Sequence, residues 1–324
     1  MGRKTELQAN HMELIKTLNA NLWKSEFHYL VCRAMYELWL LKNYRRYSVE
    51  ELTRRRFRKA FGRELDLDNP RTLNEKIQWL KLYEHLDYYP VCADKYAMKH
   101  WVAELLGTDE YNVPVIYHTP DWRTITPETV NQFPCIVKPN HSSHDFIILH
   151  SAEEVNWKQL RRRCRFWLKR DYYMESQEWQ YRDIPRQIVV EKLLETKEGK
   201  IPNDYKLNYM NGNLEFIYVS YDREGVNARC VFDKDWNVIP CYWGNSQKEY
   251  TPCPVKIPAP NSLDKMKEIG AKIAKFFKYV RVDYYDVDGQ LYIGEITLHH
   301  GGGCNPFRPQ EYDIIFGEKL DLKV

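Results

Sequence analysis

The chain has 324 residues, 44% of them hydrophobic, which is enough to bury a sizeable core in one multi-lobed unit or in two to three subdomains. With 48 basic and 45 acidic residues the formal net charge is +3, and this near balance argues against a protein that binds nucleic acid. No stretch reaches the roughly 18 apolar residues of a membrane-spanning helix, and the N-terminus lacks the basic-then-apolar order of a signal peptide. The eight cysteines show no metal-binding spacing, so we expect reduced thiols in a cytoplasmic protein.

Residues 1–68 are predicted to be helical and rich in arginine. Apolar residues follow one helical stripe, and neighbouring apolar positions widen it until the helix is apolar almost all round. Two interpretations stay open: Arg33 and Glu37 favour a packed helical cap or a dimer contact, whereas Arg45 and Arg46 suit a helix at a membrane surface. The stripe consists of Phe27, Leu30, Val31, Ala34, Leu38 and Leu41.

Two further helices are predicted before the first strand. The sequence from Thr72 to Glu75 is a capping box, and it opens a helix whose inward stripe is Leu73, Ile77 and Leu80. A second helix begins after Asp94 and stops at Gly107, which places Lys95 in its first turn. Taken alone, Lys95 is an exposed surface cation.

The stretch FPCIVKP, the polar loop NHSSH and the stretch FIILH predict two strands joined by a loop of small residues. Such a loop can offer backbone N–H groups and hydroxyls, here Ser142 and Ser143, to phosphate oxygens, while Lys138 on the incoming strand supplies a point charge. The two histidines of the loop are expected at the surface, because no other metal ligand accompanies them.

A basic helix around WKQLRRRCRFWLKR is predicted to pack through Trp157, Leu160, Cys164 and either Trp167 or Leu168. Its arginines lie on a solvated face or against a polyanion or anionic lipid. The stretch RQIVVEKLLE is predicted to be a strand that ends in charged residues.

Apolar and polar residues alternate on both sides of Asn211-Gly212, which predicts a β-hairpin. On this hairpin we expect Asp204, Lys206 and Arg223 to be half-exposed strand residues.

The stretch from Arg281 to Gly303 predicts a second hairpin, which turns on Asp288-Gly289. In such a hairpin Asp283 and Glu295 lie nearly cross-strand, close enough to share a hard cation such as Mg²⁺. The alternative is an edge hairpin with solvated acids.

Arg-Val-Asp, a hairpin and then Gly-Glu-Ile-Thr before a glycine loop resemble the last metal-binding hairpin of the ATP-grasp superfamily, and more narrowly its TupA-like branch. The resemblance runs from about Phe57 to the C-terminus, through FGRELDLDNPRTLNEKIQWLKLY, DKYAMK, IVKPNHSS, WLKRDYY, EWQYRDIPRQIVVEKLLE and NDYKLNYMNG. It implies an α+β ATP-grasp fold, in which two α+β lobes clasp ATP, with an N-terminal helical extension. The implied parts are the extension (1–68), an N-terminal subdomain (69–125), a lid subdomain (126–190) and a C-terminal subdomain with the metal site (191–324).

The resemblance also implies a role for each matching position. Phosphate contacts fall to Lys95, Lys138, Ser142, Ser143 and Asp204, and the adenine edge to Glu191, Lys192 and Leu194. The implied Mg²⁺ ligands are Asp283, Glu295 and Thr297, although many relatives carry asparagine at the last position. The implied catalytic residues are Arg281, Lys206 and Arg223, and the implied substrate residues are His299, His300, Gly301, Gly302 and Gly303.

The implied activity is an ATP- and Mg²⁺-dependent carboxylate–amine ligase that acts through an acyl phosphate. We expect it to join an amino acid to a uronic acid, or to extend an acidic peptide, in capsular or exopolysaccharide synthesis. The basic N-terminal helices could in addition contact an anionic polymer or the inner membrane face. Two alternatives stay open: a glycosyltransferase, if Asp286-Val-Asp288 is an Asp-x-Asp metal motif, and a non-catalytic polymer-binding module.

Overall fold

The computed structural model describes residues 25–225, 227–244, 253 and 255–323. These residues form two compact units, each with its own antiparallel sheet. The first unit comprises the described residues up to Tyr47, together with Val115–Glu175 and Pro185–Lys192. The second comprises Ser48–Pro114, Ser176–Ile184 and the described residues from Leu193 onward. Residues 1–24 of the predicted helical extension lie outside the described residues.

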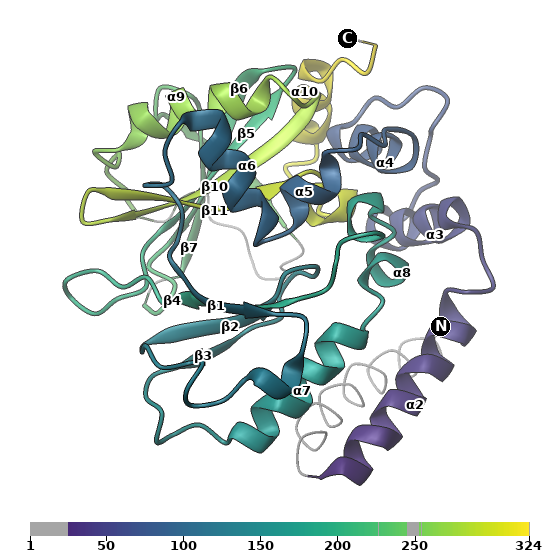
Figure 1. Ribbon diagram of the computed structural model, residues 1–324. Coiled ribbons are helices and arrows are strands. Elements are labelled where there is room, and N and C mark those ends of the chain that lie inside the picture. Colours follow the sequence, from purple (N-terminus) through teal and green to yellow (C-terminus); the bar gives the residue numbers. More distant parts are fainter. Residues whose placement is uncertain (1–24, 226, 245–252, 254, 324) are drawn as a thin grey trace. The chain divides into compact units, whose positions relative to one another are not determined.

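The first unit is built on a four-stranded sheet in the order β1-β4-β2-β3. Its strands are β1 (Val115–Thr119), β2 (Cys135–Pro139), β3 (Ile147–Leu149) and β4 (Ile188–Lys192). Helix α7 (Trp157–Lys169) covers one face of this sheet (Figure 1). Leu160, Cys164 and Trp167 of α7 are buried in the same core as Val137 and Val190, as helical spacing predicts. The unit also contains η1 (Trp122–Thr124) and most of α8 (Tyr172–Ser176).

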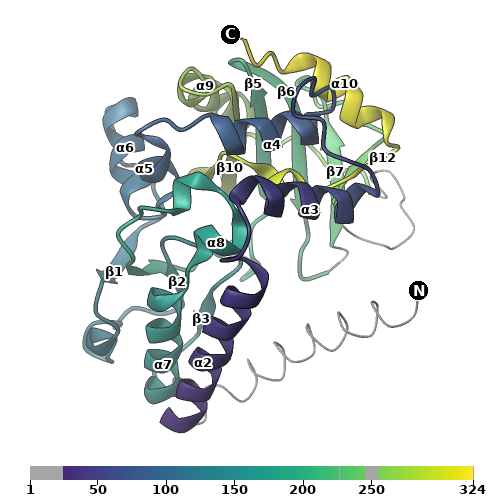
Figure 2. The same ribbon diagram turned by 90° about the vertical axis from the view of Figure 1, so that its right-hand side faces the viewer.

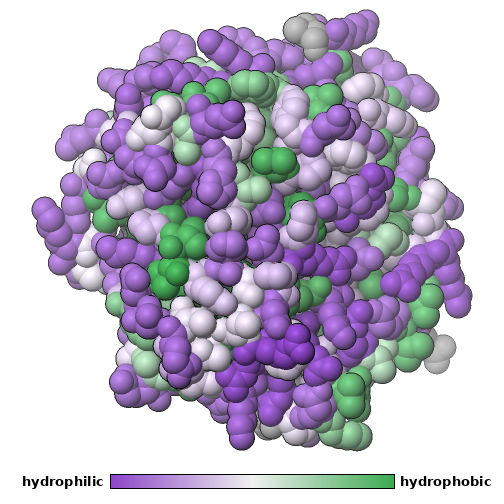
Figure 3. Space-filling view, viewed as in Figure 1, coloured by the Kyte–Doolittle hydropathy of each residue, from purple (hydrophilic) through white to green (hydrophobic). Residues whose placement is uncertain are grey.

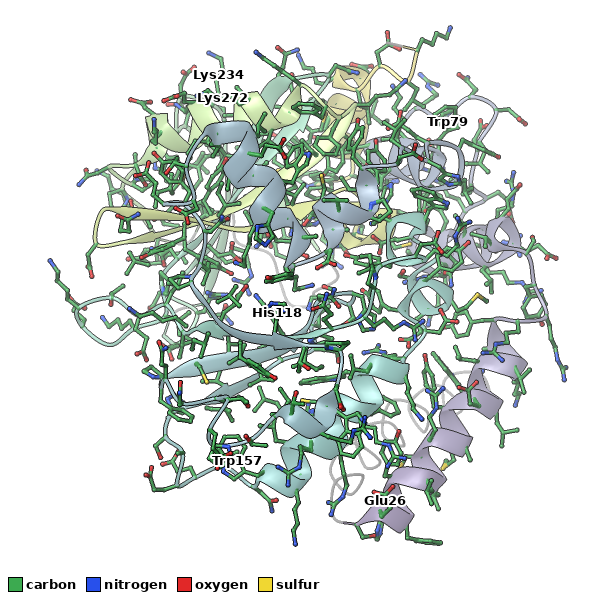
Figure 4. The ribbon with its side chains drawn as sticks, viewed as in Figure 1. Glu26, Trp79, His118, Trp157, Lys234 and Lys272 are labelled. Carbon is green, nitrogen blue, oxygen red and sulfur yellow. A yellow bond between two sulfur atoms is a disulfide. The ribbon has the colours of Figure 1, made fainter. Side chains whose placement is uncertain are left out.

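Helix α2 (Glu26–Asn43) lies beside α7 in both ribbon views (Figures 1 and 2). Glu26, at the N-terminal end of α2 (Figure 4), forms an ion pair with Arg165 of α7. The Tyr36 ring packs edge-on against Phe166, with 5.5 Å between centroids. Aromatic and cation–π contacts therefore select the face of α2 that turns inward.

The apolar stripe predicted along α2 is exposed in the structure. The buried residues are Tyr29, Cys32 and Leu40, which flank the predicted stripe. Because the helix is apolar almost all round, its sequence does not show which face packs inward. In the structure it is the face of Tyr29, whose ring lies beneath the Arg165 guanidinium. Figure 3 shows hydrophobic side chains over α2 at the lower right of the view. The exposed members of the predicted stripe are Phe27, Leu30, Val31, Ala34, Leu38 and Leu41.

The second unit is built on a six-stranded sheet in the order β11-β10-β5-β6-β7-β8. The strands are β5 (Asp204–Met210), β6 (Asn213–Tyr221), β7 (Ala228–Phe232), β8 (Val238–Ile239), β10 (Tyr279–Val287) and β11 (Gln290–Thr297). Alternate residues face opposite sides, so Ile217 and Val219 enter one core while Phe216 and Tyr218 enter another. The β5–β6 hairpin turns on Asn211-Gly212 as predicted.

Helices cover both faces of this sheet. One face packs against α5 (Tyr89–Ala93), α6 (Ala97–Leu106) and α9 (Leu263–Ala274). The other face packs against α4 (Leu73–Tyr83) and α10 (Glu311–Lys319), and α4 lies in front of the sheet in Figure 2. The remaining elements are α3 (Val49–Phe61), η2 (Trp179–Tyr181), η3 (His300–Gly303) and the strand pair β9 (Tyr242–Trp243) and β12 (Phe307–Arg308).

Capping signals in the sequence predicted the start of α4 correctly and the start of α6 less accurately. The capping box of α4 is present, because Thr72 Oγ1 accepts from the N–H of Glu75 and the Glu75 carboxylate accepts from the N–H of Thr72. Helix α6 starts at Ala97, two residues later than predicted. The Asp94 side chain accepts from the N–H groups of Tyr96 and Ala97 instead, so half-buried Lys95 lies in the turn before the helix.

The expectation that every cysteine is a reduced thiol was wrong. Cys230 of β7 and Cys253 form a disulfide, with their Cα atoms 4.6 Å apart. No sequence motif links these residues, because the fold brings them together across 23 positions. Among the helices of the described chain, none is both long and apolar enough to cross a bilayer.

Candidate active site

The β10–β11 hairpin places two carboxylates opposite each other. It turns on Asp288 and Gly289, whose φ angles of +52° and +92° suit a tight two-residue hairpin turn. Pairing is regular from Val287 and Gln290 as far as Tyr284 and Ile293, after which a bulge shifts the register by one. Asp283 therefore pairs with Glu295, as predicted.

The bulge depends on Gly294. Without the shift, Gly294 would stand opposite Asp283, and Glu295 would point to the other face of the sheet. A Cβ at Gly294 would lie 2.6 Å from the Tyr285 ring, a contact too close for any side chain. Glycine at this position therefore lets the two carboxylates share one face.

Three neighbouring strands continue this arrangement as cross-strand rows. Asp283 pairs with Lys206 of β5 on one side and with Glu295 of β11 on the other. Two residues along, Arg281 pairs with Asn208 and Thr297. Alternation puts these side chains on the face that also carries Tyr279 and Tyr218. The sheet thus presents a charged face beside the core that α4 and α10 cover.

Asp283 is the centre of this charged face. Its Oδ1 accepts from Arg281 Nε at 2.6 Å, and its Oδ2 accepts from Arg281 Nη2 at 2.7 Å and Lys206 Nζ at 2.9 Å. Lys206 Nζ also donates a hydrogen bond to Asp204 Oδ2, and Arg223 Nη1 lies 3.9 Å from that Asp204 oxygen. Burial alone would raise the pKa of Asp283, but the charges of Arg281 and Lys206 and their hydrogen bonds lower it below its ordinary value. Asp283 is therefore ionised in the folded protein.

The oxygen atoms around Asp283 fit a Mg²⁺ ion. Glu295 forms neither a hydrogen bond nor an ion pair with any described residue, and Thr297 Oγ1 is buried without a hydrogen-bond partner. The described residues contain no cluster of three or more His, Cys, Asp or Glu side chains that could hold a metal. The set of two carboxylates and one hydroxyl matches a hard cation that takes few protein ligands and completes its shell with water or phosphate oxygens.

His300 supports Arg281. Its Nδ1 accepts a hydrogen bond from the Arg281 guanidinium, and its ring stacks on Trp243 with 3.6 Å between centroids. Burial, together with the charges of Arg281 and Lys206, lowers the pKa of His300 well below its ordinary value. The imidazole is therefore neutral and holds the guanidinium against Asp283.

The glycine run after β11 forms a tight left-handed turn. Gly301, Gly302 and Gly303 have φ angles of +57°, +60° and +67°. Gln78 Nε2 donates to the carbonyl oxygens of Gly302 and Gly303, both at 2.8 Å. The N–H of Gly302 donates to the His299 carbonyl at 2.9 Å, so this N–H is used inside the turn.

In the first unit, the predicted nucleotide residues come together in part. Lys138 Nζ of β2 forms an ion pair with Glu191 Oε2 of β4 at 2.5 Å. Ser142 is buried and donates to Asp145 Oδ2 at 2.7 Å, whereas Ser143 is half-buried. His141 is also buried, so the expectation that both loop histidines lie at the surface holds only for His144.

The predicted adenine-edge segment lies where the chain leaves the first unit. The unit ends at Lys192, which is exposed, and the second unit begins at Leu193. Leu194 is half-buried, whereas its neighbour Leu193 is buried in the second unit. The chain connection between the units therefore falls inside the predicted segment.

The TupA-like ATPgrasp family model matches residues 75–321. The chain belongs to the TupA-like ATP-grasp family. It accordingly has the mixed α+β ATP-grasp fold, and helices α2 and α3 both lie before the matched range. All the predicted site residues lie within the matched range.

Solved structures similar to this TupA-like protein include three ATP-grasp enzymes. The ligase PsnB, complexed with a phosphomimetic variant of its minimal precursor, Mg and ADP, is 12% identical, with a TM-score of 0.38 over 65% of this chain and 51% of its own. D-alanine–D-alanine ligase from Bacillus anthracis, complexed with ATP, is 14% identical and has a TM-score of 0.36. The match covers 64% of this chain and 54% of that ligase. D-alanine–D-alanine ligase from Helicobacter pylori is 13% identical and has a TM-score of 0.40. The match covers 76% of this chain and 69% of that ligase.

The chain spans about half the length of the first of these solved structures. No curated protein matches the chain.

Sequence reasoning missed several polar residues of the TupA-like protein that surround the glycine turn. Gln78 and Lys81 of α4 are buried, although polar side chains on a helix usually face solvent. Glu178, next to η2, is buried beside them. The one available signal was the spacing in α4, because Gln78 and Lys81 each directly follow a residue of the predicted inward stripe, Ile77 or Leu80.

Proposed function

We propose that the protein is an ATP-dependent carboxylate–amine ligase that works through an acyl phosphate. In this reaction a substrate carboxylate attacks the γ-phosphate of ATP, ADP leaves, and an amine then attacks the acyl carbon to give an amide and phosphate. Family membership supports the proposal. The observation that carries it is the cross-strand row of Lys206, Asp283 and Glu295 beside Arg281. Phosphoryl transfer needs such positioned charges more than a side-chain nucleophile.

In the second unit, Asp283, Glu295 and Thr297 are the proposed Mg²⁺ ligands. When bound, the ion neutralises charge on the nucleotide phosphates. Arg281, held between Asp283 and His300, keeps a fixed guanidinium for the transferring phosphoryl group. Lys206 and Arg223, both beside Asp204, supply further positive charge for the phosphates and the acceptor.

In the first unit, Lys138 is the proposed partner of the ATP phosphates, and the backbone and hydroxyls around Ser142 and Ser143 are their proposed cradle. Glu191 holds the Lys138 ammonium in place. Glu191, Lys192 and Leu194 border the adenine edge in this proposal, and Lys95 of the second unit reaches the phosphates.

The proposed substrates are an amino acid, as the amine, and a uronic acid or an acidic peptide, as the carboxylate. The product would serve capsular or exopolysaccharide synthesis, as the likeness of the motifs to TupA-type proteins implies. These finer assignments are tested by measuring ADP and phosphate release with Mg-ATP across a panel of uronic acids, their nucleotide derivatives and amino acids. Release that requires both a carboxylate and an amine supports the ligase.

A glycosyltransferase fits the structure less well. Asp286 accepts hydrogen bonds from Ser262 Oγ and from the N–H of Gly289, and Asp288 accepts from the N–H of Lys197. Both acids of the Asp-x-Asp sequence therefore stabilise the turn and its surroundings.

The outer face of α2 supports a second element of the proposal, which is contact with an anionic membrane surface. Phe27 is 71% exposed and Leu38 is 64% exposed. The acids of α2 pair with arginines, as Glu26 does with Arg165, whereas Lys42 and Arg46 are exposed at the other end. An apolar stripe with flanking cations suits an interfacial helix.

Vesicle flotation tests this contact. We expect the protein to float with phosphatidylglycerol-containing vesicles, and to float much less with pure phosphatidylcholine or after Leu38→Asp. Equal flotation of Leu38→Asp and wild type contradicts the contact. A dimer in solution that Leu38→Asp dissociates assigns the face to self-association.

A further inference from the structure

A buried polar cluster of the second unit lies beside the glycine turn and is not used by the proposed phosphoryl transfer. Lys81 of α4 is 1% exposed and Glu178 is 8% exposed. Gln180 of η2 and His299, which precedes the turn, are 1% and 3% exposed. Elements far apart in the sequence thus bring a cation, an anion, an amide and an imidazole into one water-poor region.

The hydrogen-bonding capacity of this cluster is largely unused. Lys81 Nζ donates one hydrogen bond, to the Gly302 carbonyl at 3.3 Å, and no carboxylate of a described residue lies within 4.0 Å of it. Glu178 Oε2 accepts from Gln180 Nε2 at 2.9 Å, while Gln180 Oε1 has no partner. His299 Nδ1 also has no partner and lies 3.8 Å from Glu178 Oε2. Buried ions and polar atoms are costly unless a partner satisfies them.

Gly302 leaves open space beside Glu178. A Cβ on Gly302 would meet a single atom within 4 Å, Glu178 Oε1 at 3.7 Å. A Cβ on Gly303, by contrast, would lie 2.9 Å from Gln78 Nε2. The glycine turn is therefore packed tightly on one side and free on the side that faces the carboxylate.

We infer that this cluster is the subsite for the amine substrate and that this substrate is an α-amino acid. Its ammonium group meets Glu178 and Gln180 Oε1, and its carboxylate meets Lys81. A zwitterion satisfies both buried ions at once, which neither a simple amine nor a simple acid does. The inference rests on the proposed ligase function. It adds the place where the amino acid binds, with three residues not assigned above, Lys81, Glu178 and Gln180, beside Gly302.

Glu178 would also take the proton that makes the amine a nucleophile. The ammonium transfers one proton to the Glu178 carboxylate, and the freed nitrogen lone pair attacks the acyl carbon of the acyl phosphate. The new C–N bond forms, the C–O bond to phosphate breaks, and phosphate leaves with that electron pair and the second nitrogen proton. Burial raises the pKa of Glu178 to about 7, although Lys81 and Arg56 oppose the shift. A base with a pKa near the working pH is the most effective.

Hydroxylamine separates the two halves of the reaction. It is a neutral nucleophile near pH 7, so it traps an acyl phosphate as a hydroxamate without needing a base or a carboxylate contact. We would supply Mg-ATP with glucuronate, galacturonate or glutamate as the acid, and alanine, alaninamide or hydroxylamine as the nucleophile. Wild type, Glu178→Gln, Lys81→Met and the matched buried-carboxylate control Asp313→Asn are compared.

We expect Glu178→Gln to lower kcat/KM for alanine at least tenfold and to lower hydroxamate formation far less. Lys81→Met should raise the KM for alanine at least tenfold while changing that for alaninamide little, so that the preference for the free amino acid disappears. Asp313→Asn should leave all three rates near wild type, because Asp313 contacts Asn74 and not the cluster.

Two results overturn the inference. One is a kcat/KM of Glu178→Gln for alanine within twofold of the wild-type value. The other is a preference of Lys81→Met for alanine over alaninamide as large as that of wild type. Hydroxamate production shows that a variant is folded. If a variant makes none, Gly302→Ala replaces it, and an unchanged KM for alanine in that variant contradicts the subsite. Absence of hydroxamate from wild type with every acid contradicts the ligase function itself, which is a different failure.

Discussion

Replacing Asp283 by asparagine and Glu295 by glutamine should affect stability very differently, although both remove a proposed Mg²⁺ ligand. Asp283 accepts three charge-assisted hydrogen bonds, two from Arg281 and one from Lys206, in a buried setting. Asparagine keeps one acceptor oxygen and turns an NH₂ group toward the donors, which leaves buried cations without their anion. Breaking a buried ion pair in this way costs about 3–5 kcal/mol of the free energy of unfolding.

Glu295 lacks such partners in the described structure and is half-buried, so Glu295→Gln should change the free energy of unfolding by no more than about 0.5 kcal/mol. The comparison is made by urea unfolding of both variants, with ADP release measured under native conditions. Both variants should lose nearly all ATP turnover at low Mg²⁺. The reasoning fails if Asp283→Asn is destabilised by less than about 1 kcal/mol, or if the two variants are destabilised equally.

Three further predictions concern the same residues and the nucleotide lysine. Lys138→Ala should weaken ATP binding by about 1–3 kcal/mol, measured by calorimetry, and unchanged affinity would remove Lys138 from the site. The pKa of Asp283 is lower in the folded protein than its unfolded value of about 3.9, so ionised Asp283 stabilises the fold above that pH. This stabilisation is lost as the pH falls further. The difference in free energy of unfolding between wild type and Asp283→Asn should therefore shrink below about pH 4. A gap that stays constant down to pH 2 would argue against an ionised Asp283. Gly294→Val should disrupt the bulge against the Tyr285 ring and abolish Mg²⁺-dependent turnover, and a variant with normal turnover would show that the register shift is dispensable.

Local signals in the sequence predicted the hairpins and several helix boundaries. Asp288-Gly289 and the capping box at Thr72 act over a few residues, so their geometry follows from neighbouring side chains alone. The approach of Asp283 and Glu295 was predicted from the turn, but the bulge at Gly294 that makes them direct partners depends on where the Tyr285 ring packs. That contact is not visible in a pattern of apolar and polar residues.

Other features depend on contacts between distant segments, and these the sequence did not reveal. The inward face of α2 is chosen by Arg165 and Phe166 of α7, more than 100 positions away. The Cys230–Cys253 disulfide has no motif. Lys81 and Glu178 are buried near the glycine turn but come from separate parts of the chain, so no local pattern links them.

The ligase function is tested most directly by the stoichiometry of the complete reaction. Purified protein is incubated with Mg-ATP, a uronic acid and an amino acid, and ADP, phosphate and amide are quantified together. The ligase account predicts one ADP and one phosphate for each amide, with none formed when the carboxylate is omitted. Sugar transfer from a nucleotide sugar without ATP, or ATP turnover that ignores both the acid and the amine, would contradict it.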